Sequence, residues 1–296
     1  MGIFCGFLAA FFNSVGYLFN ARFLNRYNEE GRLLTYGMVG MLILSLPFTP
    51  FLFPFAALQQ PGLFALKVVA WVAAFMLGQL GFFLALRYFE ASRLSSLLGL
   101  KIIVLALIFT VWNQGRLLPA QWVAIFISAI SAMMFNWSGA GRQRLLGWLF
   151  LMLTLVMYPT CDILETSMVL HVRQSGFSDL RSAFAVVSLI YPILGLVAMP
   201  GMLKYKPSKE QFALALPYSA VWIMSQLALL FCFAKVLPVF GNVILATRGV
   251  FSVLMGLSLP LFGLASLDSN VSARKWIQRI IAAILMVLAI GLYSWK

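Results

Sequence analysis

Charged residues are scarce in this chain. Only 10% of its 296 residues are charged, with eight acidic and 21 basic side chains, whereas about a quarter is usual in a soluble domain. Hydrophobic residues make up 62% of the chain, and the mean hydropathy is +0.97. So few charged side chains cannot cover a surface that faces water, which excludes an ordinary soluble globular protein.

Residues that bind metals or form disulfides are also few. The chain has three cysteines, Cys5, Cys161 and Cys232, with no Cys-x-x-Cys pair, and a single histidine, His171. Buried free thiols are the simplest interpretation, and we expect no metal centre. The sequence contains neither a P-loop nor a Gly-x-Gly-x-x-Gly motif followed by an acid, so we expect no bound cofactor and no use of ATP.

The net charge of +13 does not indicate a nucleic-acid-binding protein, because the basic residues stand singly between long apolar runs. The excess of Lys and Arg is instead typical of the topology signal in membrane proteins. The first apolar run has no basic residue before Arg22 and no small-residue cleavage site, so we expect a retained membrane helix there and not a signal peptide.

Ten segments are long and apolar enough to form membrane helices, each with about 20 mostly apolar residues. They are residues 2–24, 32–55, 64–89, 91–112, 119–137, 145–170, 181–203, 210–235, 237–262 and 275–295. The short connections leave no room for a soluble domain. We therefore predict an all-α integral membrane protein with ten transmembrane helices, whose function lies within the bilayer.

The chain also repeats itself. A shift of 147 residues places Gln79 on Gln226 and Lys101 on Arg248. Membrane transporters are often built from duplicated halves, with the substrate site between them. These two polar matches at one offset predict a duplication of five helices.

The predicted halves are residues 1–140 and 141–296. Because five is an odd number, the second half must be inverted relative to the first, with the pseudo-two-fold axis in the membrane plane. Two inverted five-helix repeats are an architecture of secondary transporters.

The first half ends with GRLLPAQWVAIFISAISAMMF, a connection of the type Gly-charged-x-(three residues)-x-Trp. With its ten helices in two halves, the chain resembles the drug/metabolite transporter superfamily and its EamA-like branch. In the branches that carry sugar phosphates and nucleotide sugars, basic residues of the fourth and ninth helices meet the phosphate. Lys101 and Arg248 occupy similar positions, whereas Arg116 stands where relatives commonly have an acid.

Lys101 and Arg248 lie near the middle of their apolar segments. A charge there costs about 2.5 to 3.5 kcal/mol on insertion scales, so each needs a partner, a water-filled cavity or a substrate. One interpretation is that both cations bind an anionic group of a solute. The alternative is a neutral structural network with Asp162 and Glu165, and the two interpretations are compatible if pairing in one state is exchanged for substrate in another.

Asp162 and Glu165 are three residues apart and share one helix face. As acids within a membrane segment, they are candidates for proton coupling. The alternatives are a salt bridge or, for Glu165, a side chain that reaches towards the interface. Pro159 precedes them and is expected to kink this helix.

Neutral polar residues complete the candidate substrate site. A shift of 145 residues places Tyr17 on Asp162 and Asn20 on Glu165, which predicts an asymmetric cavity with acids in one half only. Gln79 and Gln226 offer amides that can bind hydroxyl or carbonyl groups, although hydrogen bonds between helices explain them equally well. Tyr158 is a further candidate for the lining, with packing as its alternative.

The orientation in the membrane is open. Thirteen basic residues lie on the connections after the odd-numbered segments: Arg22, Arg26, Arg32, Arg87, Arg93, Arg142, Arg144, Lys204, Lys206, Lys209, Arg274, Lys275 and Arg279. Six lie on the opposite side, which is the side of the two termini: Lys67, Arg116, Arg173, Arg181, Lys235 and Lys296. The charge count favours termini outside the cytoplasm, whereas the family resemblance implies cytoplasmic termini.

The sequence thus predicts a secondary transporter for a small anionic or zwitterionic metabolite in the cell membrane of a bacterium. An exporter of neutral or hydrophobic compounds is the alternative within the same class. From other classes, an intramembrane enzyme acting on lipid-linked substrates and a helper of another membrane protein remain, although we do not expect an enzyme. The expected partners are the solute and the lipid bilayer, and the chain is either a monomer or a homodimer.

Overall fold

A computed structural model gives the arrangement of the chain. It describes residues 1–85, 88–89, 94, 97–112, 117–134, 145–206, 208–258 and 273–295. Within these ranges the secondary structure is helical and contains no strand. Arg116 and the predicted connection between the two halves, around residue 140, lie outside the described ranges.

Long helices make up most of the fold. They are α1 (Gly2–Tyr27), α2 (Glu30–Ser45), α4 (Pro61–Ala85), α8 (Leu145–Arg173), α9 (Asp179–Ala198), α11 (Lys209–Val236) and α14 (Ala273–Ser294). The other helices are α3 (Thr49–Leu52), α6 (Lys101–Trp112), α7 (Pro119–Met134), α10 (Pro200–Lys204), α12 (Pro238–Leu245) and α13 (Arg248–Ser258), of which α7 is as long as α2. Short 3₁₀ turns at Leu46–Phe48 and Leu98–Leu100 precede α3 and α6.

Seven helical stretches in the described part are long and apolar enough to cross a membrane, two of them made by α2 with α3 and by α9 with α10. Their outer faces are apolar as well, since Val287 on α14 and Val69 on α4 are 67% and 66% exposed. Such surfaces are unfavourable in water and suit a lipid environment. The chain is therefore a multi-pass α-helical membrane protein.

Three further predicted segments contain shorter apolar helices, at Leu98–Val111, Pro119–Met134 and Pro238–Phe251. The predicted continuous segment 237–262 is wrong in detail. Its α-helix is interrupted by a turn at Ala246 and Thr247, which separates α12 from α13. Thr247 contributes to the interruption, because its hydroxyl donates to the carbonyl of Ile244 and so competes with helical bonding.

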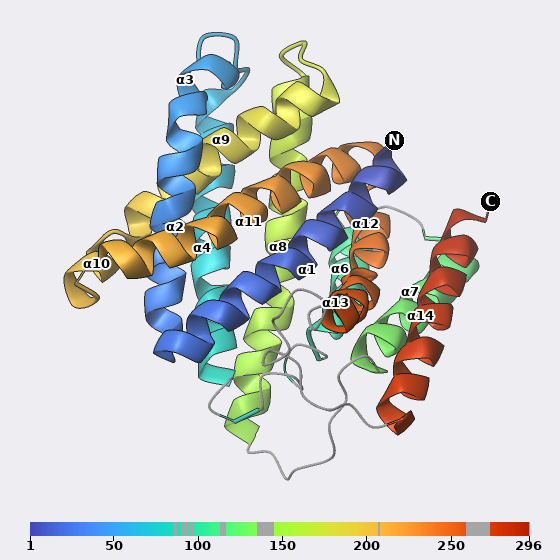
Figure 1. Ribbon diagram of the computed structural model, residues 1–296. Helices are drawn as coiled ribbons and strands as arrows, with labels where there is room; N and C mark the ends of the chain where they lie inside the picture. The colour runs from blue at the N-terminus through green and yellow to red at the C-terminus, as the bar shows by residue number, and fades with distance from the viewer. Residues whose placement is uncertain are drawn as a thin grey trace.

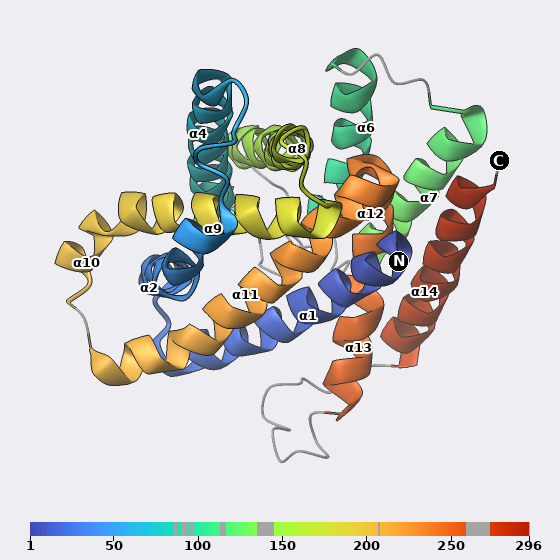
Figure 2. The same ribbon diagram turned by 90° about the horizontal axis from the view of Figure 1, so that it is seen from above.

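The most extensive helix contacts join the two predicted halves. Helices α1 and α11 run side by side in opposite directions, and α4 pairs with α8 in the same way (Figures 1 and 2). Helix α7 packs along α14, and α2 packs on α9. The two halves are therefore interleaved and do not form separate bodies.

Small residues allow these helices to approach closely. A Cβ added to Gly78 of α4 would lie 2.7 Å from the ring of Tyr158 on α8, and one added to Gly195 of α9 would lie 2.7 Å from the carbonyl oxygen of Met38 on α2. Close backbone approach is how membrane helices gain packing energy, since lipid supplies no hydrophobic force between them. The glycines thus fix the helix spacing around the centre of the molecule.

Gly195→Ala is expected to weaken the contact of α2 with α9, because the new methyl group would meet the backbone of α2. Overpacking of this kind costs about 1 to 3 kcal/mol, which thermal unfolding in detergent would detect. Gly291→Ala on α14 is the control, since its Cβ would meet no atom within 4 Å and alanine favours helix. Equal losses in both variants would contradict the assigned packing.

Candidate substrate site

An ion pair and a hydrogen bond to the same carboxylate join three helices, α6, α8 and α12. Lys101 of α6 places its Nζ 3.2 Å from Oδ2 of Asp162 on α8, and Asn242 of α12 donates a 2.9 Å hydrogen bond from Nδ2 to the same oxygen. Asp162 is 7% exposed and Asn242 is 1% exposed. A buried pair needs such additional hydrogen bonds to offset the loss of water. Lys101 is thus neutralised within the protein.

Asn242 is held from a second side. Its Nδ2 also donates to the carbonyl oxygen of Pro238, 3.0 Å away, while its Oδ1 is buried with no hydrogen-bond partner in the structure. Pro238 begins α12, so this bond ties the amide to the first turn of its own helix. The amide is therefore oriented before it meets Asp162.

Glu165 lies one helical turn after Asp162 but has a different environment. Its Oε1 accepts a 2.9 Å hydrogen bond from Nε1 of Trp71 on α4, and the residue is 4% exposed. No ion pair to it occurs in the described part of the chain. The acid is buried without a compensating cation, which is rare in a membrane helix unless it has a function.

Arg248, the predicted counterpart of Lys101, makes no ion pair among the residues described. Its guanidinium carbon lies 5.9 Å from the centre of the Tyr17 ring, a cation–π contact. Its backbone carbonyl accepts a 2.9 Å hydrogen bond from Ser14 of α1. Of the predicted neutral network, the ion pair between Lys101 and Asp162 is present. Arg248 and Glu165 do not form an ion pair with each other.

These contacts follow the two sequence shifts. Lys101 contacts Asp162, and the residues at the shifted positions, Arg248 and Tyr17, contact each other. Positions related by the two sequence shifts therefore make corresponding contacts.

The same correspondence holds one turn away. Trp71 contacts Glu165, and at the shifted positions Tyr218 of α11 lies beside Asn20 of α1. The Oδ1 atom of Asn20 is buried with no hydrogen-bond partner. The carboxylate of Glu165 in the contact with Trp71 thus corresponds to the amide of Asn20 in the contact with Tyr218.

Arg248 and Glu165 each contact an aromatic side chain, Tyr17 and Trp71 respectively, and further aromatic residues lie nearby. Tyr158 is within electrostatic range of Tyr17, Tyr218 and Arg248. The rest of the series is made by contacts between Tyr218 and Trp222 (ring centres 5.8 Å apart), Trp222 and Tyr191 (Nε1 to OH, 3.2 Å) and Tyr191 and Trp71 (5.8 Å). The structure therefore places the predicted Tyr17, Asn20 and Tyr158 in one neighbourhood with Arg248.

Gln79 and Gln226 lie on α4 and α11, and no side-chain hydrogen bond involves either of them in the described part. Gln226 is 7% exposed. Their proposed alternative, hydrogen bonding between helices, is thus not observed there. Both remain predictions as substrate contacts.

The sequence did not predict the two residues that donate hydrogen bonds to the buried acids, Asn242 to Asp162 and Trp71 to Glu165. Asn242 carried a signal, since a single amide in an apolar segment is costly unless it is paired or functional. Trp71 carried none, because a Trp in an apolar run indicates packing as readily as a hydrogen bond. Only the arrangement of α4 against α8 brings its indole to Glu165.

Pro159 does not interrupt its helix, since α8 continues from Leu145 to Arg173.

Among the residues described, no three His, Cys, Asp or Glu side chains gather as a metal site would. His171 instead anchors the segment before α4: its Nδ1 lies 3.2 Å from Nζ of Lys67, and its Nε2 contacts the carbonyl oxygen of Gln59.

Comparisons with known proteins concern the fold. No family model matches the chain, and no curated protein matches it. A solved structure described only as "Crystal structure of protein" is similar to it, with a TM-score of 0.68, 13% sequence identity, and coverage of 99% of this chain and 96% of that chain. At this identity the likeness shows a shared fold over nearly the whole length and nothing about the substrate.

Proposed function

We propose that this protein is a secondary transporter that moves a small anionic or zwitterionic metabolite across the membrane by alternating access. The observation that carries the proposal is Arg248, a partly buried cation in a membrane segment with no ion-pair partner among the described residues. An unpaired intramembrane cation calls for an anion. A guanidinium binds carboxylate or phosphate groups through two parallel hydrogen bonds.

The proposed architecture is ten membrane segments in two inverted halves, residues 1–140 and 141–296. The corresponding elements are α1 and α8, α2 and α9, α4 and α11, α6 and α12 with α13, and α7 and α14. Under this correspondence the contact of α1 with α11 is equivalent to that of α8 with α4, and the contact of α6 with α8 is equivalent to that of α13 with α1. The contacts of α2 with α9 and of α7 with α14 each join equivalent helices.

A pair of hydrogen bonds supports the same correspondence. Thr154 donates from Oγ1 to the carbonyl of Gly78, and Ser225 donates from Oγ to the carbonyl of Ala9. The shift of 147 relates Gly78 to Ser225, and the shift of 145 relates Ala9 to Thr154. The same two positions are therefore bonded in both halves with donor and acceptor exchanged. Sites at the interface of inverted repeats are where secondary transporters bind substrate.

The charges of Lys101, Asp162 and Arg248 limit which solutes the proposed site could bind. Lys101 is already neutralised by Asp162, so one cation and not two is available for the substrate. A single carboxylate or a phosphate held by Arg248 fits this better than a solute that needs both cations. We assign proton coupling to Glu165, because Asp162 is occupied by Lys101 and Asn242.

An exporter of neutral compounds would require the four charges to cancel among themselves, and the described contacts cancel only two of them. The acid pair that an intramembrane enzyme could use is Asp162 with Glu165, but Asp162 is already bound by Lys101 and Asn242. We place the protein in the cell membrane of a bacterium.

The first test is a thermal-shift screen of the detergent-purified protein against anionic, zwitterionic, cationic and neutral metabolites. A solute at 100 times its dissociation constant stabilises the folded state by about 2.7 kcal/mol. We expect carboxylated or phosphorylated solutes to raise the Tm of the wild type and of Arg26→Gln, an exposed control, but not of Arg248→Gln. If neutral compounds stabilise all three proteins equally, the exporter is the better description.

Lys101→Gln is expected to lower stability directly, because it leaves Asp162 buried without its cation. Breaking one partner of a buried pair costs about 3 to 5 kcal/mol. The double variant Lys101→Gln/Asp162→Asn removes both charges and is expected to recover most of this loss. A double variant as unstable as the single one would contradict a structural role for the pair.

Glu165→Gln retains an oxygen that accepts from Trp71, so the variant is expected to fold and to bind substrate. Because it cannot carry a proton, a pH gradient should no longer drive uptake into liposomes, whereas exchange of labelled for unlabelled substrate should continue. Glu210→Gln, at an exposed ion pair with Arg26, serves as the control. Gradient-driven uptake by Glu165→Gln at the wild-type rate would remove this residue from coupling.

A further inference from the structure

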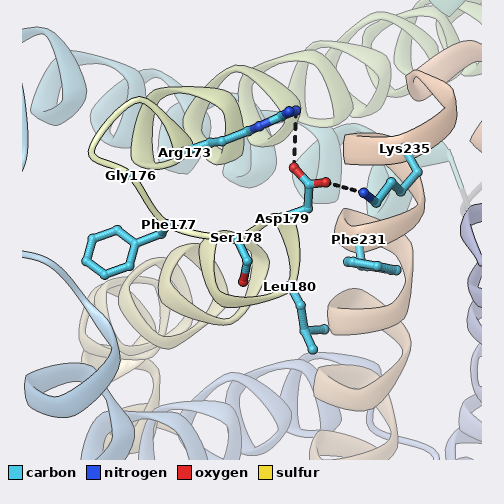
Figure 3. A pocket seen from close by; sticks show the side chains of 8 residues that line it. All are labelled: Arg173, Gly176, Phe177, Ser178, Asp179, Leu180, Phe231 and Lys235. Carbon is cyan, nitrogen blue, oxygen red and sulfur yellow. Dashed lines mark ion pairs between the residues drawn. The ribbon is translucent and has the colours of Figure 1, made fainter.

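A pocket of about 520 Å³ lies where α8 ends and α9 begins, beside the end of α11. The residues that line it include Arg173, Phe177, Asp179, Leu180, Phe231 and Lys235 (Figure 3). All three helices belong to the candidate membrane spans. A pocket at the ends of spanning helices lies at the level of the lipid headgroups.

The pocket carries excess positive charge. Asp179 is 8% exposed and forms two ion pairs (Figure 3). Its Oδ1 lies 3.1 Å from Nη1 of Arg173, and its Oδ2 lies 2.5 Å from Nζ of Lys235. Arg181 stacks on the ring of Phe177, with its guanidinium carbon 4.2 Å from the ring centre. Two cations of the pocket thus flank one carboxylate, which leaves one positive charge in excess. The Arg173 and Lys235 side chains are 53% and 45% exposed and retain free N–H donors.

The basic residues are unevenly distributed on this side of the molecule. The sequence places only six Lys and Arg on the connections of the side that holds the termini, and Arg173, Arg181 and Lys235 are three of them. Orientation in the membrane requires no such clustering, because the topology signal depends on the number of basic residues near the spans. Two of these three, Arg173 and Lys235, line the same pocket, which indicates a local anionic ligand.

The N-terminal end of α9 adds to the positive potential of the pocket. Ser178 caps the helix by accepting from the backbone N–H of Arg181, so the amides of Asp179 and Leu180 are the first-turn donors left at the pocket. The N-terminal end of a 20-residue helix also favours negative charge.

Apolar side chains form the remaining wall. Phe231 lies one turn before Lys235 on α11, and Leu180 is 51% exposed. A soluble anion would gain nothing from them. A lipid would place its headgroup on the cations and its acyl chains on the apolar wall.

We propose that this pocket binds the headgroup of an anionic phospholipid. Arg173 and Lys235 donate to the phosphate, and Phe231 and Leu180 contact the first acyl carbons. This site is separate from Arg248, and its existence does not depend on the transport activity.

The test compares phosphatidylglycerol, phosphatidylcholine and inorganic phosphate added to the purified protein, with Tm and native mass spectrometry as readouts. The variant is Arg173→Gln/Lys235→Gln. Its matched control is Arg26→Gln/Arg32→Gln, which removes two cations, one from the last turn of α1 and one from the first turn of α2, together with their ion pairs. We expect the wild type and the control to prefer phosphatidylglycerol over phosphatidylcholine on the order of tenfold, and the pocket variant to lose this preference.

Three results would overturn the proposal: an unchanged preference in the pocket variant, equal binding of phosphatidylcholine by the wild type, or a full stabilising effect of inorganic phosphate alone. Because the pocket variant also removes two ion pairs, Asp179→Asn separates folding from lipid binding. It loses the same ion pairs but keeps both cations, so its preference for phosphatidylglycerol should persist even if its Tm falls. Loss of the preference in Asp179→Asn would mean that the three residues only clamp the helices together, which also contradicts the proposal.

Discussion

The buried ion pair between Lys101 and Asp162 is the interaction on which the centre of the molecule depends. In a membrane protein a charge away from water needs an opposite charge or a polar partner, since lipid offers neither. Lys101 and Asp162 satisfy each other, and Asn242 supplies a further donor to the same carboxylate oxygen. Through these three residues α6, α8 and α12 are fixed together. The other polar contacts of the centre are arranged around this neutral core.

The contact at the shifted positions, between Arg248 and Tyr17, lacks an acid. Arg248 stands at the position of Lys101, but its neighbour is Tyr17, and an aromatic face compensates a cation only weakly. One turn away, Glu165 is held by Trp71, whereas Asn20 lies beside Tyr218. The pattern of contacts is thus repeated while the charges are not. Lys101 and Asp162 form a neutral pair, whereas Arg248 and Glu165 make no ion pair among the described residues and are the groups to which we assign substrate binding and coupling in the proposed function.

Much of this was accessible from the sequence, and the reasons for the rest are physical. Apolar runs predicted the positions of the helices because their length must match the bilayer, and the duplication indicated by the shifts of 145 and 147 stays a prediction. The interruption at Ala246 and Thr247 was missed because a turn within an apolar segment does not alter its hydropathy. Trp71 and the interfacial pocket were missed because both depend on helices that are distant in sequence.

The interruptions themselves explain where the cations lie. Lys101 directly follows the 3₁₀ turn Leu98–Leu100, and Arg248 directly follows the turn at Ala246 and Thr247. Irregular backbone at membrane depth is tolerated where it is buried in protein or lines a cavity, and transporter sites are typically built at such broken helices. A cation at each break is costly until an anion meets it. For Lys101 that anion is Asp162. For Arg248 the chain supplies none among the described residues, and a solute that brings its own negative charge would complete the pair.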